Sequence, residues 1–294
     1  MKKLVKSLVC VCLLMSGLAV AAGQDNAGPP SPPKILTITR EFLKPGKAGA
    51  THEKYESAFV KAFTAAKWKT TYLAVDSLSG KPRSLFFTGY DSFDAWEKDA
   101  KATEKAAAFS SALDRASVAD GELLSELDSN VFAYREDYSL RAGVDIPHMR
   151  YFEISIYRTR PGHEKDWDAI VKMVTAAYDK IPNAHWATYQ GVYGSSGNNY
   201  LVITPLKAAS EIDEAFAQGK QFEAAMGEDG MKKLAELSAA TIESSESNLF
   251  AFNPRNSYPS EKWIKADPDF WKPKKASAPA SAAKKPAEPA APKP

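Results

Sequence analysis

Glu153 is the carboxylate in this sequence that is best placed to do chemistry. It stands in the middle of the β-rich segment Tyr151–Tyr157, where side chains alternate between two faces, so that Glu153 shares a face with both tyrosines. An unpaired charged carboxylate among aromatic rings costs several kcal/mol to bury. Glu153 should therefore be paired, close to water, or raised in pKa. Two interpretations stay open: a polar anchor or general base in a pocket, and a paired structural glutamate near a barrel end.

Aromatic residues add to this candidate site. Trp68 and Tyr72 recur as Trp186 and Tyr189 in a segment of similar pattern. Such rings can stack on an aromatic ligand, or they can form the core of a barrel. The candidate ligand-binding residues are Glu153, Tyr157, Tyr151, Trp186, Tyr189, Trp68, Tyr72 and Glu41, the last from the matching face of the segment Ile35–Phe42.

The four histidines do not form a recognisable metal motif. No two of them are three or four residues apart, and no His-Glu-x-x-His occurs. His52 and His163 are each followed by a glutamate at the expected start of a helix, which favours a local helix cap. The sequence predicts no metal centre. Cys10 and Cys12 both lie in the N-terminal segment, so thiolate chemistry is not expected in the body.

The elements that must position these residues occur twice. Lys44-Pro45-Gly46 recurs as Arg160-Pro161-Gly162, and His52-Glu53-Lys54 recurs as His163-Glu164-Lys165. Ser129–Tyr134 recurs as Ser247–Phe252, so the landmarks keep their order at offsets of 111 to 118 residues. This order indicates a tandem duplication.

Hydrophobic periodicity predicts the order β-α-β-β-α-β in each copy. Expected strands are Ile35–Phe42, Trp68–Val75, Ser84–Thr88 and Ser129–Tyr134, then Tyr151–Arg158, Trp186–Tyr193, Tyr200–Thr204 and Ser247–Phe252. Expected helices are His52–Ala66 and residues 105–127, then Glu164–Lys180 and residues 221–242. A four-stranded sheet with helices on one face leaves its other face bare, and two copies can cover each other. We therefore expect an α+β fold of two ferredoxin-like repeats forming a pseudo-dimeric barrel.

The alternation of the first strand in each copy predicts which residues face the barrel interior. We expect Leu36 and Ile38, with Phe152 and Ile154, to face the helices. The opposite face, which carries Glu41 and Glu153, should then face the barrel interior.

Composition sets the boundaries. The predicted segments are a signal peptide (1–22), a proline-rich lead-in (23–33), the two repeats (34–138 and 148–254) joined by a linker (139–147), an aromatic extension (255–271) and a disordered Ala/Pro/Lys tail (272–294). The first segment has a basic start, a short apolar run and small residues at 19–22, which predicts export to the periplasm or the medium, with no transmembrane segment left after cleavage.

Charge argues against nucleic acid as a partner. Without the three lysines of the signal segment and the six lysines and one glutamate of the tail, 29 basic and 35 acidic residues remain, a net charge of −6. Nucleic-acid binding needs a concentrated basic face. A fused pair of repeats closes without a second chain, so we expect a monomer.

The strand, Lys/Arg-Pro-Gly and Glu-containing helix that open each copy resemble the dimeric α+β barrel superfamily, in particular its antibiotic-biosynthesis-monooxygenase-like and NIPSNAP-like members. The resemblance implies a cavity that binds haem, polyketides or small aromatic molecules, or one that is packed and inert. Haem-degrading members share an Asn, Trp and His set, and neither first strand here carries an Asn. We therefore expect no cofactor, with haem as the less favoured alternative.

Three functions follow as hypotheses. The first is a non-catalytic exported protein that binds a small apolar or aromatic ligand between the repeats. The second is a monooxygenase-like enzyme of the same barrel type. The third is a packed structural or interaction module without a ligand.

Overall fold

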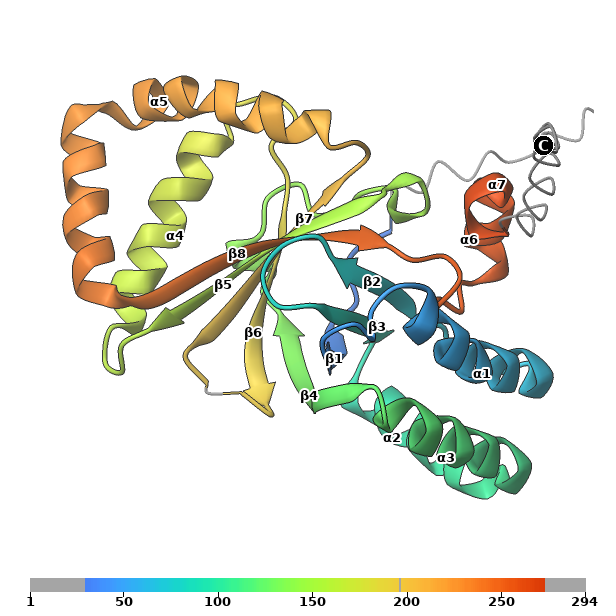
Figure 1. The fold of residues 1–294 in the computed structure, drawn as a ribbon. Helices are drawn as coiled ribbons and strands as arrows, with labels where there is room; N and C mark the ends of the chain where they lie inside the picture. Colours follow the sequence, from blue (N-terminus) through green and yellow to red (C-terminus); the bar gives the residue numbers. More distant parts are fainter. Residues whose placement is uncertain (1–29, 196, 273–294) are drawn as a thin grey trace, which may run out of the picture.

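The computed structural model describes residues 30–195 and 197–272 (Figure 1). The predicted signal peptide, most of the lead-in and nearly all of the tail lie outside these residues. The first half contains β1 (Ile35–Leu43), α1 (Ala50–Ala66), β2 (Leu73–Ser77), β3 (Arg83–Tyr90), α2 (Phe93–Lys105), α3 (Ala107–Gly121) and β4 (Leu124–Tyr134). The second contains β5 (Tyr151–Thr159), α4 (Glu164–Tyr178), β6 (Ala187–Tyr193), β7 (Asn199–Leu206), α5 (Ser210–Thr241) and β8 (Ile242–Phe252). Short 3-10 turns, η1 (Glu136–Tyr138) and η2 (Ile146–His148), join the halves, and α6 (Glu261–Ala266) and α7 (Pro268–Trp271) follow.

The eight strands form one closed antiparallel barrel in the order β1-β3-β2-β8-β5-β7-β6-β4. In the first half β1 pairs with β3 and β4, and in the second β5 pairs with β7 and β8. The halves meet at two seams, β2 with β8 and β4 with β6. The predicted mixed α+β fold with a closed barrel is therefore confirmed.

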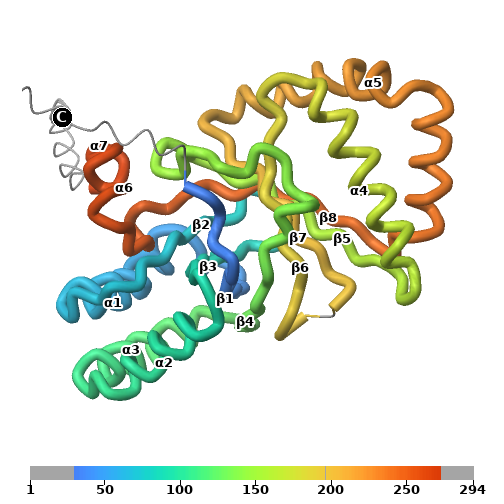
Figure 2. Tube along the Cα trace, turned by 180° about the vertical axis from the view of Figure 1, so that it is seen from behind, coloured from blue at the N-terminus to red at the C-terminus, as the bar shows by residue number. Residues whose placement is uncertain are grey.

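The helices of the two halves lie on opposite sides of the barrel. Helices α1, α2 and α3 lie on one side, and α4 and α5 on the other (Figures 1 and 2). Helix α5 bends sharply at Gly227, whose φ of 72° and ψ of 165° interrupt the helix. The bend brings one limb of α5 over the end of α4 and the other limb alongside it (Figure 1).

The barrel interior is a packed apolar core, and here the predicted orientation of the strand faces is wrong. Leu36 and Ile38 of β1 lie in one buried cluster with Phe152 and Ile154 of β5 and with Phe250 of β8. Alternation separates two faces of a strand without saying which one points inward. An eight-stranded barrel is just wide enough to be filled by side chains, so the more uniformly apolar face points inward. Glu41 and Glu153 consequently lie on the outer face, beneath the helices.

Several element boundaries also differ from prediction, including the start of β8, which begins at Ile242 and not at Ser247. Strand β2 begins at Leu73, so Trp68 and Tyr72 precede it, and Tyr72 forms an isolated bridge with Tyr258. The helix expected over 105–127 ends at Gly121. The residues from Leu124 onward form strand β4 and do not continue the helix. Their leucines have helical spacing, but the nine residue pairs that β4 forms with β1 stabilise the strand more.

The aromatic extension packs on the barrel. Trp271 is 3% exposed and belongs to the barrel core cluster, and its indole nitrogen donates a hydrogen bond to the carbonyl of Pro147 at 2.9 Å. Over the ranges 30–195 and 197–272, none of the helices combines the length and the apolar character needed to cross a bilayer.

Candidate functional site

A cleft of about 950 Å³ lies in the second half, between the outer face of the sheet and helices α4 and α5. Strand β5 contributes Glu153 and Tyr157, and α4 contributes Trp167 and Val174. The first limb of α5 closes one side with Glu211 and neighbouring residues. The volume falls within the range of small-molecule pockets, which are about 300–1,000 Å³.

The walls of the cleft follow from the local sequence pattern. Alternation along β5 places Glu153 and Tyr157 on the outer face, opposite the side chains that fill the barrel. Helical spacing places Trp167 and Val174 on the face of α4 that packs toward the sheet. The Trp167 ring stacks on Tyr200 with centroids 4.8 Å apart and planes at 26°. Aromatic side chains and the carboxyl group of Glu153 therefore line the cleft.

Two buried polar atoms on the cleft wall have no hydrogen-bond partner among the described residues. These are the indole nitrogen Nε1 of Trp167 and the hydroxyl of Thr175. Burial raises the pKa of the Tyr157 hydroxyl, and the nearby Glu153 carboxylate adds to that effect. Buried polar groups normally find a partner, so an unpartnered donor and hydroxyl in a cleft point to a ligand or an ordered water.

The structure brings three of the eight candidate residues together in this cleft: Glu153, Tyr157 and Trp186. Tyr189 is instead in the barrel core, 5.5 Å from Tyr134 between ring centroids. Tyr151 is half-buried at the start of β5 and does not line the cleft.

The remaining three candidates lie in the first half. Tyr72 packs edge-on against Phe63, and Trp68 stacks on Phe109 at 4.4 Å. The Trp68 indole donates to Asp99, so its polar atom is already bonded. Glu41 belongs to a second, separate site.

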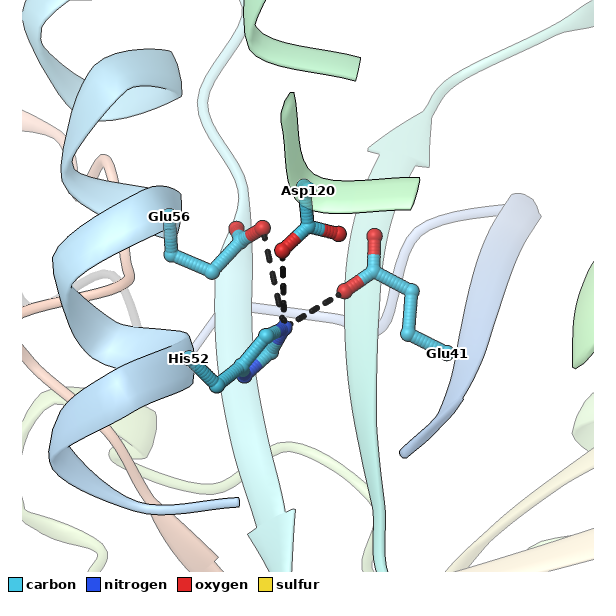
Figure 3. Close-up of side chains that lie close together, drawn as sticks. All are labelled: Glu41, His52, Glu56 and Asp120. Carbon is cyan, nitrogen blue, oxygen red and sulfur yellow. Dashed lines mark hydrogen bonds and ion pairs between the residues drawn. The ribbon is translucent and has the colours of Figure 1, made fainter. Parts of the chain in front are cut away.

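That second site is a buried cluster of Glu41, His52, Glu56 and Asp120 (Figure 3). Strand β1 supplies Glu41, α1 supplies His52 and Glu56 from successive turns, and α3 supplies Asp120. The His52 Nε2 atom lies 3.0 Å from Glu41 Oε2, 3.5 Å from Asp120 Oδ1 and 3.7 Å from Glu56 Oε1. All four potential ligand atoms lie within 4.8 Å of one another, so the cluster could hold a metal ion.

Burial and crowding of charge shift the pKa values in this cluster. Burial, together with the charges of Glu41 and Asp120, raises the pKa of Glu56 to about 10. Burial and Glu41 raise the pKa of Asp120 to about 6, although His52 opposes the shift. Burial by itself lowers the pKa of His52, but the hydrogen bond and charge of Glu41 outweigh it, so the pKa of His52 is raised.

The sequence offered one signal for this cluster. His52 and Glu56 are four residues apart on a helix, which places them on one face, and a motif of paired histidines does not include such a mixed pair. The predicted cap role of His52 is wrong: Gly49 occupies the cap position, and the His52 side chain is 2% exposed. His163 does stand at the cap of α4, but its ring bonds Asp166 rather than a backbone N–H.

The residues of the cleft do not fit a haem held by histidine. Among the described residues that line the cleft, His185 is the one histidine. Its Nδ1 lies 2.7 Å from the carbonyl oxygen of Asn183 and its Nε2 lies 2.8 Å from that of Pro205. Both nitrogens therefore face backbone acceptors, and neither presents a lone pair to an iron in the cleft.

No protein-family model matches the sequence, and no curated protein matches it. Solved structures resemble the fold. An anthrone oxidase-like protein is 16% identical, with a TM-score of 0.50 over 75% of this chain and 92% of that one. A proposed monooxygenase from Fusobacterium nucleatum is 12% identical, with a TM-score of 0.49 over 76% and 93% of the two chains. A variant chlorite dismutase from Candidatus Nitrospira defluvii, in complex with cyanide, is 9% identical, with a TM-score of 0.45 over 76% and 92%.

These identities establish a likeness of fold. The match to the anthrone oxidase-like protein, with a TM-score of 0.50, supports the barrel fold that the sequence predicted.

Proposed function

We propose that this protein binds a small, planar hydroxy-aromatic molecule in the cleft between the outer sheet face and helices α4 and α5. The observation that carries the proposal is the 950 Å³ cleft lined by Trp167, a residue whose buried N–H has no partner among the described residues. The ligand site is thus outside the barrel, within the second half, rather than between the halves as the sequence suggested.

The wall supports this ligand class through its chemistry. Tyr157, Trp167 and Trp186 line the cleft and give an aromatic ligand apolar rings to pack against. The Trp167 N–H donates to a ligand carbonyl or hydroxyl, because indole nitrogen is a donor only. Glu153 is an acceptor when ionised, so it suits a ligand hydroxyl.

Tryptophan fluorescence tests the proposal with 2-naphthol and 1,8-dihydroxyanthraquinone as probes. We expect saturable quenching by wild-type protein. Val174→Trp should fill the cleft and abolish saturation, because Val174 lies on its wall. Val118→Trp adds the same ring at a residue of α3 that is 76% exposed, and it should leave binding unchanged. A linear, non-saturating titration with both probes, or equal binding by Val174→Trp, would remove the cleft as a ligand site.

A monooxygenase-like activity is the second candidate, and the position of Glu153 favours it. A carboxylate that lines an aromatic cleft can accept a proton from an activated ring CH₂. With anthrone as probe, this proton transfer leaves a carbanion that molecular oxygen oxidises to the ketone, so one anthrone and one O₂ give one anthraquinone and one water. Glu153→Gln should then abolish oxygen uptake while retaining quenching by 1,8-dihydroxyanthraquinone. If the wild-type protein binds 1,8-dihydroxyanthraquinone but takes up no oxygen with anthrone, the monooxygenase-like activity is excluded and the non-catalytic binding role stands.

We also propose that the chain is an exported monomer built from two tandem ferredoxin-like repeats. The matching pairings of β1 with β3 and β4, and of β5 with β7 and β8, support the repeats. Closure of the barrel by strands of one chain supports the monomer. The basic and apolar N-terminal residues support export.

A further inference from the structure

Glu41 and Tyr157 occupy the same place in the two halves of the barrel. Each is the seventh residue of a nine-residue strand, and each pairs with a residue of the neighbouring strand, Ser84 for Glu41 and Tyr200 for Tyr157. In the second half this place is filled by aromatic rings, because Tyr157 and Tyr200 pack against Trp167. The fold therefore does not require a polar cluster here.

The corresponding helix positions make the same contrast. Trp167 follows His163 by four residues, as Glu56 follows His52. Where the second half buries an indole, the first half buries a carboxylate that is 2% exposed. Without a metal ion, three buried carboxyl groups must take up protons or pair with His52, and a cation at their centre would supply the compensating charge instead. Glu56 Oε1 and Asp120 Oδ1 both lack a hydrogen-bond partner among the described residues, and both face His52.

The hydrogen bonds behind His52 place a hydrogen on its Nδ1 atom and turn its Nε2 atom toward the carboxyl groups. The Ser84 hydroxyl donates its single hydrogen to Asp76 Oδ1 at 2.5 Å. Its oxygen can therefore only accept from His52 Nδ1, 3.4 Å away, which places the hydrogen of a neutral imidazole on Nδ1. Nε2 faces the three carboxyl groups and lies at hydrogen-bond distance from Glu41 Oε2 (Figure 3). A proton on Nε2 satisfies Glu41 and leaves Glu56 Oε1 and Asp120 Oδ1 without a partner among the described residues, whereas one cation at the centre can contact all four side chains.

The distances from His52 Nε2 to the three carboxylate oxygens are similar to the edges of a metal coordination tetrahedron. Ligand bonds of about 2.0–2.2 Å in tetrahedral geometry place neighbouring ligand atoms about 3.4 Å apart. The observed distances from His52 Nε2 to the three carboxylate oxygens are 3.0, 3.5 and 3.7 Å. Asp76 and Ser84 orient the ring from behind, as outer partners of metal-bound histidines do.

We propose that Glu41, His52, Glu56 and Asp120 bind one divalent transition-metal ion that ties α1 and α3 to β1. One imidazole with three carboxylates suits Zn²⁺, which takes both ligand types, or Mn²⁺, which favours carboxylates. All four side chains are at most 9% exposed, so the site is closed to substrate and its role is structural. This site is independent of the ligand cleft on the other side of the barrel.

The test is metal binding by the full-length protein after dialysis against EDTA and then against metal-free buffer, with Zn²⁺ and Mn²⁺ added separately. We expect native mass spectrometry to show one tightly held ion. We also expect the melting temperature to rise by about 5–10 °C when the free metal is 100-fold above its Kd. Glu56→Gln keeps the size of the side chain, and its amide resembles a protonated carboxyl. It should fold and bind the ion at least about 100-fold more weakly.

Glu126→Gln is the matched control, because Glu126 is exposed on β4 and outside the cluster. It should bind metal as the wild type does. If Glu56→Gln does not fold, Asp120→Asn provides the same comparison. The proposal is overturned if the wild-type protein retains neither ion and neither ion raises its melting temperature. It is equally overturned if the two cluster variants keep wild-type affinity, since any bound ion then lies elsewhere.

Discussion

Gly194 lies so close to Ser129 that a Cβ atom on the glycine would overlap the Ser129 carbonyl oxygen. This contact lies at the seam where β6 of the second half pairs with β4 of the first. Gly194 also has a φ of 76°, a conformation that favours glycine. Gly80, with a φ of 71°, makes a similar close approach to Asn248 near the other seam. Both junctions of the barrel thus depend on a glycine turn.

Gly194→Ala is therefore predicted to loosen the β4–β6 seam. The left-handed backbone alone costs about 1–3 kcal/mol for a non-glycine residue, and the contact with Ser129 adds to it. We expect thermal unfolding to begin several degrees lower. Gly197→Ala, in the same turn but with open space around it, should leave the melting temperature within a degree or so of wild type. Equal melting temperatures for both variants would contradict the importance of this contact.

Trp167→Phe is predicted to weaken ligand binding without emptying the cleft. The phenyl ring keeps an apolar surface beside Tyr200 and removes the N–H that has no protein partner among the described residues. One hydrogen bond is worth about 0.5–1.5 kcal/mol, so the Kd for 1,8-dihydroxyanthraquinone should rise about 2- to 10-fold. Trp68→Phe removes an indole in the first half that bonds Asp99, and it serves as the control. An unchanged Kd in Trp167→Phe would place the ligand elsewhere.

Metal removal is predicted to loosen one side of the barrel selectively. An ion held by Glu41, His52, Glu56 and Asp120 joins β1, α1 and α3, and none of these ligands comes from the second half. Hydrogen–deuterium exchange should therefore accelerate in α1 and α3 after EDTA treatment, while exchange in α4 stays unchanged. Uniform acceleration in all three helices would speak against a local clamp.

A monomeric state is predicted from the closed strand order. Because β2 pairs with β8 and β4 with β6, strands of one chain cover both edges of each half's sheet. Light scattering coupled to size exclusion should give a mass no greater than the 32.1 kDa of the full chain. A mass of twice that value at micromolar concentration would contradict this prediction.

The sequence by itself determined the order and type of the elements. Alternation in Ile35–Phe42 and Tyr151–Arg158 indicated strands, and helical spacing located α1 and α4 almost to their ends. It also separated the two faces of β5 and grouped Glu153 with Tyr157, because side-chain direction along a strand is a local property.

Only the tertiary structure decided which face of each strand points into the barrel and which distant residues meet. Barrel closure is a global property, and it sent Phe152 inward and Glu153 outward beneath α4. The cluster around His52 joins Glu41 to Asp120, which are 79 positions apart in the sequence, and their meeting depends on α3 packing beside α1. No local pattern encodes such a contact, because it follows from the packing of helices on a sheet that has already closed.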